Sequence, residues 1–223
     1  RKKREFLRQR FFQQINRVRM ENLRSRISPH FTFNVLGREI NQFNGSEEVK
    51  HNLMELVKYL RRSLELTEKL SVSLQDELDF VRTYIELERG RVGEDFVATI
   101  TVEDGLDATR IMIPSMIVQI PVENAIKHGL AGKDGKKELM VYVSRETNGI
   151  RITVTDNGRG YLPQVVSATR GTGTGLKVLY QTIQLLNTKN KSDKIRFNIT
   201  NRSDGQTGTE VSVYIPFRFS YDL

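Results

Sequence analysis

The sequence contains no cysteine, and only three of its 223 residues are histidine. Without cysteine the chain can form neither a disulfide nor a thiolate metal site, so other groups must hold any cofactor. No apolar run approaches the roughly 18 to 20 residues that span a bilayer. The opening RKKREFLRQR lacks the apolar core of a signal peptide. As given, the chain is expected to be soluble.

Acidic residues are scarce only at the start of the chain. Residues 1–26 hold ten basic and two acidic side chains, which account for the whole net charge of +8. The neutral remainder lacks a spread basic patch, so we expect no nucleic-acid partner. The basic block is typical of the cytoplasmic flank of a transmembrane helix, and a solvated basic helix is the alternative. We therefore expect a transmembrane or sensor region upstream of residue 1 and a location at the cytoplasmic face of the inner membrane.

The first third of the sequence has the spacing of amphipathic helices. One helix is predicted over residues 5–42, with a bend at Pro29 because proline frees a backbone carbonyl. A second begins after Ser46, and its apolar seam suits an antiparallel partner or a dimer core; the seam residues are Val49, Leu53, Leu56, Leu60 and Leu64. A third helix, residues 74–89, follows Ser73 as a possible cap with Glu77 nearby. We expect this third helix to link two domains.

Beyond Gly93 the pattern changes to the alternation of strands. Five strands are predicted, over residues 96–102, 139–143, 150–154, 195–199 and 211–215. One helix is predicted after Pro114 and another after Gly175. An antiparallel or mixed sheet covered by helices, an α+β sandwich, accommodates this order of elements.

Three clusters of glycine and polar residues mark the second part of the chain: VENAIKHG at 122–129, DNGRG at 156–160 and GTGTGL at 171–176. Asn124, Lys127 and His128 share one helical face, where an amide oxygen could meet a hard cation and the nitrogens could meet phosphates. Asp156 ends a strand beside glycines that let a backbone approach a flat ligand. The third cluster precedes a helix whose amino terminus attracts phosphate.

In this order the three clusters resemble the N, G1 and G2 boxes of the GHKL (Bergerat) ATP-binding superfamily, shared by gyrase, Hsp90, histidine kinases and MutL. The segment ISPHFTFN at 27–34 resembles the phosphoacceptor box of the LytS-like sensor histidine kinases, usually NPHFLFN. The segments LQDELDFVRTYIELERGR and QIPVEN are also similar to that family. The resemblance covers nearly the whole chain from about residue 20.

The resemblance implies a role for each matching residue. His30 would be the phosphoacceptor, oriented by Asn34, and Asn124 the magnesium ligand. Asp156 would bind the adenine amino group, with support from Thr209. Lys127 and His128 are candidates for the phosphate side, and His128 could equally be a cation at a helix end. The remaining residues would shape the nucleotide pocket and its lid: Gly158, Gly160, Gly171, Gly173, Gly175 and Leu176.

The catalytic base is the least defined part of this assignment. The position four before Asn124, often acidic or Asn in the superfamily, is Ile120. Glu123 is the nearest acid and the remaining candidate, although one residue from Asn124 places it about 100° round the helix. His30 itself needs little activation, because an imidazole with a pKa near 6.5 is mostly neutral at pH 7. Phe31 stands where many histidine kinases have an acid.

The sequence therefore predicts a sensor histidine kinase core with two parts. Residues 1–72 are expected to form a helical hairpin that dimerises into a four-helix bundle and presents His30. Residues 73–223 are expected to form the ATP-binding sandwich, with residues 74–91 as the linker helix. The implied cofactors are ATP and Mg²⁺. The implied partners are a second copy of the chain, in a homodimer, and a cognate response regulator receiver domain. The alternative is a GHKL conformational switch or pseudokinase scaffold that binds ATP without phosphorylating histidine.

Overall fold

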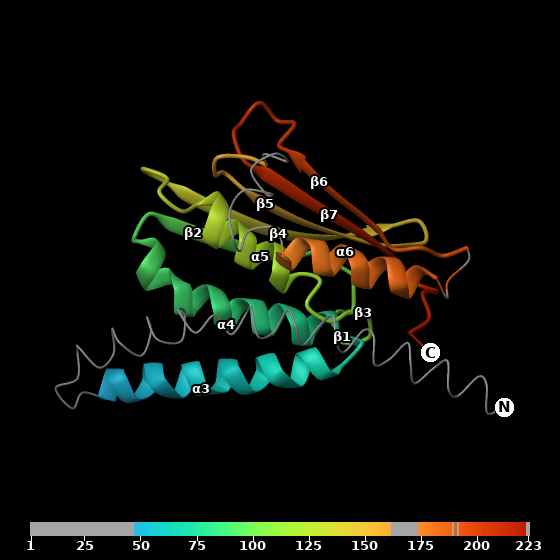
Figure 1. Cartoon of the computed structure of the whole chain (residues 1–223), viewed down its shortest axis with the longest axis horizontal. Helices are drawn as coiled ribbons and strands as arrows, with labels where there is room; N and C mark the ends of the chain where they lie inside the picture. The colour runs from blue at the N-terminus through green and yellow to red at the C-terminus, as the bar shows by residue number, and fades with distance from the viewer. Residues whose placement is uncertain (1–46, 162–173, 189, 191, 222–223) are drawn as a thin grey trace.

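The structure is a computed structural model that describes residues 47–161, 174–188, 190 and 192–221. The predicted helix at 5–42, its bend at Pro29 and the box around His30 lie outside these residues. Within the described part, the elements form successive layers (Figure 1). Helix α3 lies at one side, α4 lies beside it, α5 and α6 follow, and a sheet forms the opposite side.

Two long helices form the layer farthest from the sheet. Helix α3 runs over Glu47–Glu68 and α4 over Leu74–Val92, so both predicted helices are found. Ser73 caps α4, since its hydroxyl oxygen accepts a hydrogen bond from Asp76 N at 3.0 Å. The Tyr59 ring of α3 stacks on Phe80 of α4, with centroids 4.9 Å apart. This packing joins the two helices through aromatic rings.

A mixed five-stranded sheet forms the other side of the molecule. Its strand order is β2-β4-β5-β7-β6, and only the β2–β4 pair is parallel. The strands are β2 (Phe96–Val102), β4 (Lys137–Glu146), β5 (Gly149–Asp156), β6 (Arg196–Asn201) and β7 (Thr209–Pro216). All five predicted strands are therefore present, each close to its expected position. The mixed sheet with helices on one side confirms the predicted class of fold.

The core lies between the sheet and the helices. Strand β5 buries Ile150, Ile152 and Val154 on one face, as the period of two requires. Helix α6 (Thr174–Asn187) buries Leu179 and Ile183 in the same core. The alternation also places Asp156, the next residue of this series, on the helix-covered face at the end of β5.

Three local features differ from the sequence prediction. Strands β1 (Ser71–Ser73) and β3 (Met112–Pro114) pair antiparallel, although neither was predicted. The helix predicted after Pro114 is present as α5 (Gln119–Asn124), and it begins five residues after that proline because Pro114 is paired in β3 and Met116 has a φ of 70°. Helix α5 then continues as a π-helix, Ala125–Gly129. This irregular connection places α5 against α4.

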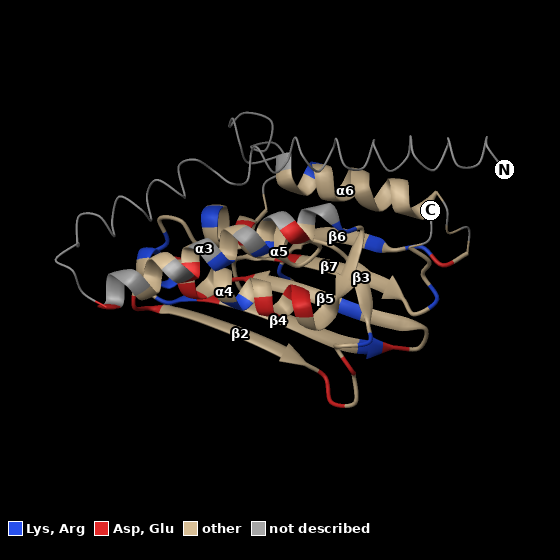
Figure 2. Cartoon of the chain, turned by 90° about the horizontal axis from the view of Figure 1, so that it is seen from below, with Lys and Arg blue, Asp and Glu red and all other residues tan. Residues whose placement is uncertain are grey.

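Charges of both signs are distributed over the described helices and strands (Figure 2). This agrees with the balanced charge expected for the chain beyond residue 26. Among residues 47–221, apart from those not described, no helix is both long enough and apolar enough to cross a membrane.

Candidate functional site

Asp156 is a buried carboxylate at the end of the central strand β5. Its side chain is 4% exposed, and Oδ1 accepts hydrogen bonds from Gly158 N at 2.8 Å and Thr209 N at 3.4 Å. Burial raises the pKa of Asp156, and the two backbone N–H groups and nearby Arg202 oppose this only in part. The site therefore contains an acceptor that is desolvated and held in a fixed orientation.

Glycines surround this carboxylate because no side chain would fit there. A Cβ on Gly129 would lie 2.8 Å from the Asp156 carboxylate, and one on Gly158 would lie 2.0 Å from Gly129 O. Gly208, with a φ of 139°, would place a Cβ 1.9 Å from Asp156 O. Gly129 and Gly208 were not assigned a role from the sequence. Their positions in the sequence could have indicated a role, because Gly129 directly follows His128 and Gly208 directly precedes Thr209.

Two asparagine side chains hold the loop after β5. Asn157 Oδ1 accepts from Glu138 N at 2.8 Å, and its Nδ2 donates to Lys136 O at 3.0 Å. Asn201 Oδ1 accepts from Tyr161 N at 2.6 Å and would lie 2.8 Å from a Cβ added to Gly160. Gly160 has a φ of 84°, which favours glycine. The loop that carries Gly158 and Gly160 is thus fixed at both ends.

Asn124 is oriented by its own helix. Its Nδ2 donates to Ile120 O, one turn earlier, at 2.8 Å. This bond uses the amide nitrogen, so the amide oxygen is the atom left to bind a ligand. A carbonyl oxygen of this kind is a ligand that Mg²⁺ accepts, together with water and phosphate oxygens. Within the described residues, no cluster of three or more His, Cys, Asp or Glu side chains could hold a metal instead.

Glu123 and Lys127 are paired with each other. Glu123 is buried, and its two oxygens accept from Gln119 Nε2 at 3.0 Å and from Lys127 Nζ at 3.3 Å. The pKa of Tyr84, a residue of α4, is raised by burial and further by the nearby negative charge of Glu123. Glu123 thus belongs to a buried polar group near α4.

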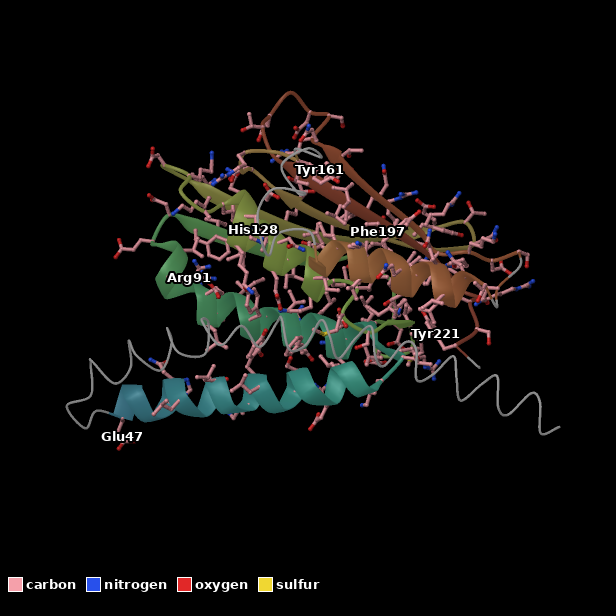
Figure 3. The ribbon with its side chains drawn as sticks, in the orientation of Figure 1. Glu47, Arg91, His128, Tyr161, Phe197 and Tyr221 are labelled. Atoms are coloured by element: carbon pink, nitrogen blue, oxygen red, sulfur yellow. The ribbon has the colours of Figure 1, made fainter. Side chains whose placement is uncertain are left out.

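His128 lies in the π-helix, between α4 and the strands (Figure 3). Burial lowers its pKa, and the positive charges of Lys127 and Arg159 lower it further. The Arg159 guanidinium donates to Ala131 O at 2.6 Å, which holds that charge close by. The described part of the site therefore places the positive charges of Lys127 and Arg159 near the His128 imidazole.

The structure brings together most, but not all, of the predicted residues. Asp156, Gly158 and Thr209 meet directly, and Asn124, Lys127 and His128 lie on the adjoining helical turn. Gly175 and Leu176 lie in the first turn of α6, which packs against α5. Four predicted residues lie outside the described part of the chain: His30, Asn34, Gly171 and Gly173.

Comparison with protein families places these features in two known domains. Residues 18–96 match the family described as histidine kinase. Residues 109–218 match the family described as histidine kinase-, DNA gyrase B- and HSP90-like ATPase. The second match contains the whole site around Asp156, and the first contains His30. The chain therefore carries a histidine kinase domain followed by an ATP-binding domain, and it belongs with the sensor histidine kinases.

Individual relatives agree with this assignment. The chain is 28% identical, over 90% of its length, to sensor histidine kinase YpdA of Escherichia coli. It is 32% identical, over 84% of its length, to sensor histidine kinase/phosphatase LytS of Staphylococcus aureus. The chain spans about a third of the length of these curated relatives. The resemblance to LytS-like sensor histidine kinases inferred from the sequence is thereby confirmed.

A solved structure shows the same fold. The histidine kinase domain of the blue-light activated histidine kinase from Erythrobacter litoralis EL346 aligns with a TM-score of 0.51 and 15% identity. The alignment covers 92% of this chain and 94% of that one. At this identity the likeness concerns the fold alone, and it supports the predicted combination of a helical part and a GHKL sandwich.

Proposed function

We propose that this chain is the catalytic core of a sensor histidine kinase, which uses ATP and Mg²⁺ to phosphorylate His30. The observation that carries the proposal is the buried Asp156 with its surrounding glycines, inside an ATPase domain that follows a histidine kinase domain. We assign residues 1–72 to dimerisation and phosphoacceptance and residues 73–223 to ATP binding.

The adenine end of ATP would bind at Asp156. The exocyclic amino group of adenine is a hydrogen-bond donor, and a desolvated carboxylate is a strong acceptor for it. Because Gly129, Gly158 and Gly208 carry no side chain, the backbone packs directly against Asp156, and a flat ring at this carboxylate would meet backbone at these positions. Thr209 supports the site because its N–H fixes the carboxylate orientation.

The phosphate end would lie toward Asn124, where the amide oxygen would hold Mg²⁺. A bound Mg²⁺ neutralises charge on the phosphate oxygens during phosphoryl transfer. Lys127 and His128 are the phosphate-side residues on the same helical turn, and Lys127 would have to leave Glu123 to reach a phosphate. We assign the glycine cluster that includes Gly171, Gly173 and Gly175, with Leu176, to the remaining contacts.

Phosphoryl transfer would proceed from ATP to a ring nitrogen of His30. The bond between the γ-phosphorus and the bridging oxygen breaks, a nitrogen–phosphorus bond forms, and ADP leaves. Asn34, one helical turn after His30, would orient the ring. The ring then has to lose its second proton, and Glu123 is the acid that we assign as acceptor. Its hydrogen bonds to Gln119 and Lys127 would have to rearrange first.

The partners follow from the reaction. A phosphorylated histidine is a donor for an aspartate on a response regulator receiver domain, which we propose as the recipient. The apolar seam of α3 would contribute to a four-helix bundle in a homodimer. We place the chain at the cytoplasmic face of the inner membrane, preceded by a transmembrane or sensor region.

The test is incubation of the chain with ATP labelled at the γ-phosphate, followed by acid and base treatment. A label that is lost in acid and stable in base identifies phosphohistidine. His30→Gln should abolish the label and leave ATP affinity unchanged, whereas the control His51→Gln, an exposed position of α3, should retain it. A parent chain that binds ATP but acquires no acid-labile label would instead identify a conformational switch or pseudokinase.

A further inference from the structure

Glu77 is a fully buried carboxylate near the beginning of α4. Its oxygens accept hydrogen bonds from three backbone N–H groups at the beginning of α5. Oε2 accepts from Met116 N at 2.8 Å, and Oε1 accepts from Val118 N at 2.9 Å and Gln119 N at 3.1 Å. A single side chain thus satisfies donors that are 39 to 42 residues away in the sequence.

These donors have no local partner that could replace Glu77. Val118 precedes α5 and provides no side-chain cap, although helices usually begin with a residue that does. The N–H groups are buried, so water cannot replace the carboxylate without opening the structure. Met116 has a φ of 70°, a conformation that a surrounding structure must impose on a residue other than glycine. Glu77 is part of that surrounding structure.

The hydrogen bonds that Glu77 accepts from the beginning of α5 lie next to the bond that orients Asn124. Glu77 holds the N–H of Gln119, and the next residue, Ile120, supplies the carbonyl that accepts from Asn124 Nδ2. Asn124 is five positions after Gln119, which is about 7.5 Å along the helix axis. The direction of the Asn124 amide oxygen therefore depends on where the first turn of α5 is fixed.

The beginning of α4 is also joined to the segment just before β3, which leads on to α5. Leu74 N donates to Ile111 O at 2.8 Å, and Gln75 N donates to Ala108 O at 3.0 Å. The Ser115 hydroxyl donates to Leu66 O at the end of α3. A displacement of α3 or α4 would thus be passed to the segment that leads into α5.

We propose that Glu77 is a positioning residue for the magnesium side of the nucleotide site, and that it links α4 to Asn124. This inference rests on the proposed function. It is separable from adenine binding, because Asp156 is held by Gly158 and Thr209, residues of the β5–β7 side, and by no group of α4.

The experiment compares ATP affinity with Mg²⁺ and with EDTA, measured by calorimetry on the whole chain. The ratio of the two affinities is the magnesium gain. Glu77→Ala removes all three hydrogen bonds and should reduce this gain by about tenfold, the lower end of what outer-shell changes do to metal sites. ATP affinity in EDTA should change by less than about threefold. Glu77→Gln keeps one acceptor oxygen and should give an intermediate gain.

Two controls separate this effect from a general loss of structure. Asp79→Asn changes an exposed carboxylate of the same helix, which accepts hydrogen bonds from the side chains of Gln75 and Arg82, and should leave both affinities unchanged. Asp156→Ala should lower both affinities in equal proportion and leave the magnesium gain intact. Hydrogen exchange should show faster exchange at Val118 and Gln119 in the Glu77 variants and parental exchange at Ile152.

The outcomes are distinct. Folded Glu77 variants that keep the full magnesium gain, or that lose affinity equally with Mg²⁺ and with EDTA, would overturn the positioning role and leave the proposed function standing. A parent chain that binds no ATP would overturn the proposed function and this role with it. If the Ala variant does not fold, the Gln variant decides, because it preserves the size of the side chain.

Discussion

Two buried carboxylates of this chain have opposite uses. Glu77 is 0% exposed and Asp156 is 4% exposed. Glu77 accepts three short hydrogen bonds from the backbone, whereas Asp156 accepts one at 2.8 Å and a long one at 3.4 Å. Burial raises the pKa of Asp156, so its negative charge is incompletely compensated. A carboxylate used fully by the backbone serves the fold, and one with capacity left is available to a ligand.

The surroundings of the two residues differ in the same way. Glu77 belongs to a helix that also buries large apolar side chains, including Leu74, Leu78 and Val81. Asp156 has glycines as neighbours, where the structure leaves no room even for a Cβ. The Glu77 carboxylate is held by distant backbone donors, whereas the Asp156 carboxylate is packed directly against the backbone of glycines. The predictions below test this contrast.

The largest effect is expected on stability at Glu77. Glu77→Ala leaves three buried N–H groups without an acceptor, and each such group costs about 1 to 3 kcal/mol. The free energy of unfolding, measured by urea denaturation, should fall by at least about 3 kcal/mol. The control Asp79→Asn should change it by less than about 0.5 kcal/mol. A Glu77→Ala chain as stable as the parent would show that the N–H groups find other partners.

Asp156→Asn should lower ATP affinity without lowering the stability of the fold. The neutral amide keeps an acceptor for Gly158 N but replaces a charged acceptor for adenine, so ATP affinity should fall about ten- to hundredfold. Stability at pH 7 should not fall. Because the pKa of Asp156 is raised in the fold, its favourable contribution is present below about pH 3.8 and is lost as the pH rises through the folded value. At neutral pH the ionised group therefore opposes folding.

Calorimetry for binding and urea denaturation for stability would measure both quantities on the same sample. A variant that loses stability and affinity together would mean that Asp156 is as structural as Glu77, and the contrast between the two carboxylates would fail.

Gly158→Ala tests the space around Asp156. Its Cβ would lie 2.0 Å from Gly129 O, so the backbone has to shift, at a cost of about 1 to 3 kcal/mol. Gly205→Ala is the matched control: its φ of 80° is strained for alanine, by roughly 1 to 2 kcal/mol, but nothing lies within 4 Å of the new Cβ. Both variants should lose stability, and only Gly158→Ala should lose ATP affinity. If the two variants bound ATP with equal affinity, the loop after β5 would not be part of the nucleotide site.

Much of this architecture follows from the sequence alone. The five strands of the sheet show alternation, and α4 begins at its predicted cap, because these signals are local. The meeting of Asp156 with Thr209 was expected only from the resemblance to a family, since 53 residues separate them. The π-helix and the three-residue strands β1 and β3 carry no periodic pattern that would predict them.

Glu77 shows why the remainder could not be predicted. Its position four residues after Ser73 indicated a residue near a helix cap, yet its partners lie at Met116 to Gln119. Hydropathy predicts an exposed side chain for a glutamate on a helix, and only the tertiary structure shows it to be buried. The burial of Glu123 near α4 was hidden for the same reason. Glu77 in addition depends on distant backbone donors, which have no sequence signature.

The smallest effect is expected at His128, on the boundary between the two regions. Its pKa is lowered by burial, by Lys127 and by Arg159, so the folded chain holds this proton less tightly than the unfolded chain. Its contribution to stability is present above the usual value near 6.5 and is lost as the pH falls through the folded value. Comparing unfolding at pH 7 and pH 5, the parent should lose more stability than His128→Gln, while the exposed His51→Gln should follow the parent.

Bound phosphates would raise the pKa of His128, whereas its surroundings in the fold lower it. Their negative charge would offset Lys127 and Arg159, raise the pKa of His128 and cause a fraction of a proton to be taken up when ATP binds near pH 6.5. Calorimetry in two buffers of different ionisation enthalpy measures this uptake. It should be smaller in His128→Gln than in the parent. If the two were equal, His128 would lie too far from the phosphates to sense them, and it would belong with Glu77 to the part of the chain that serves the fold.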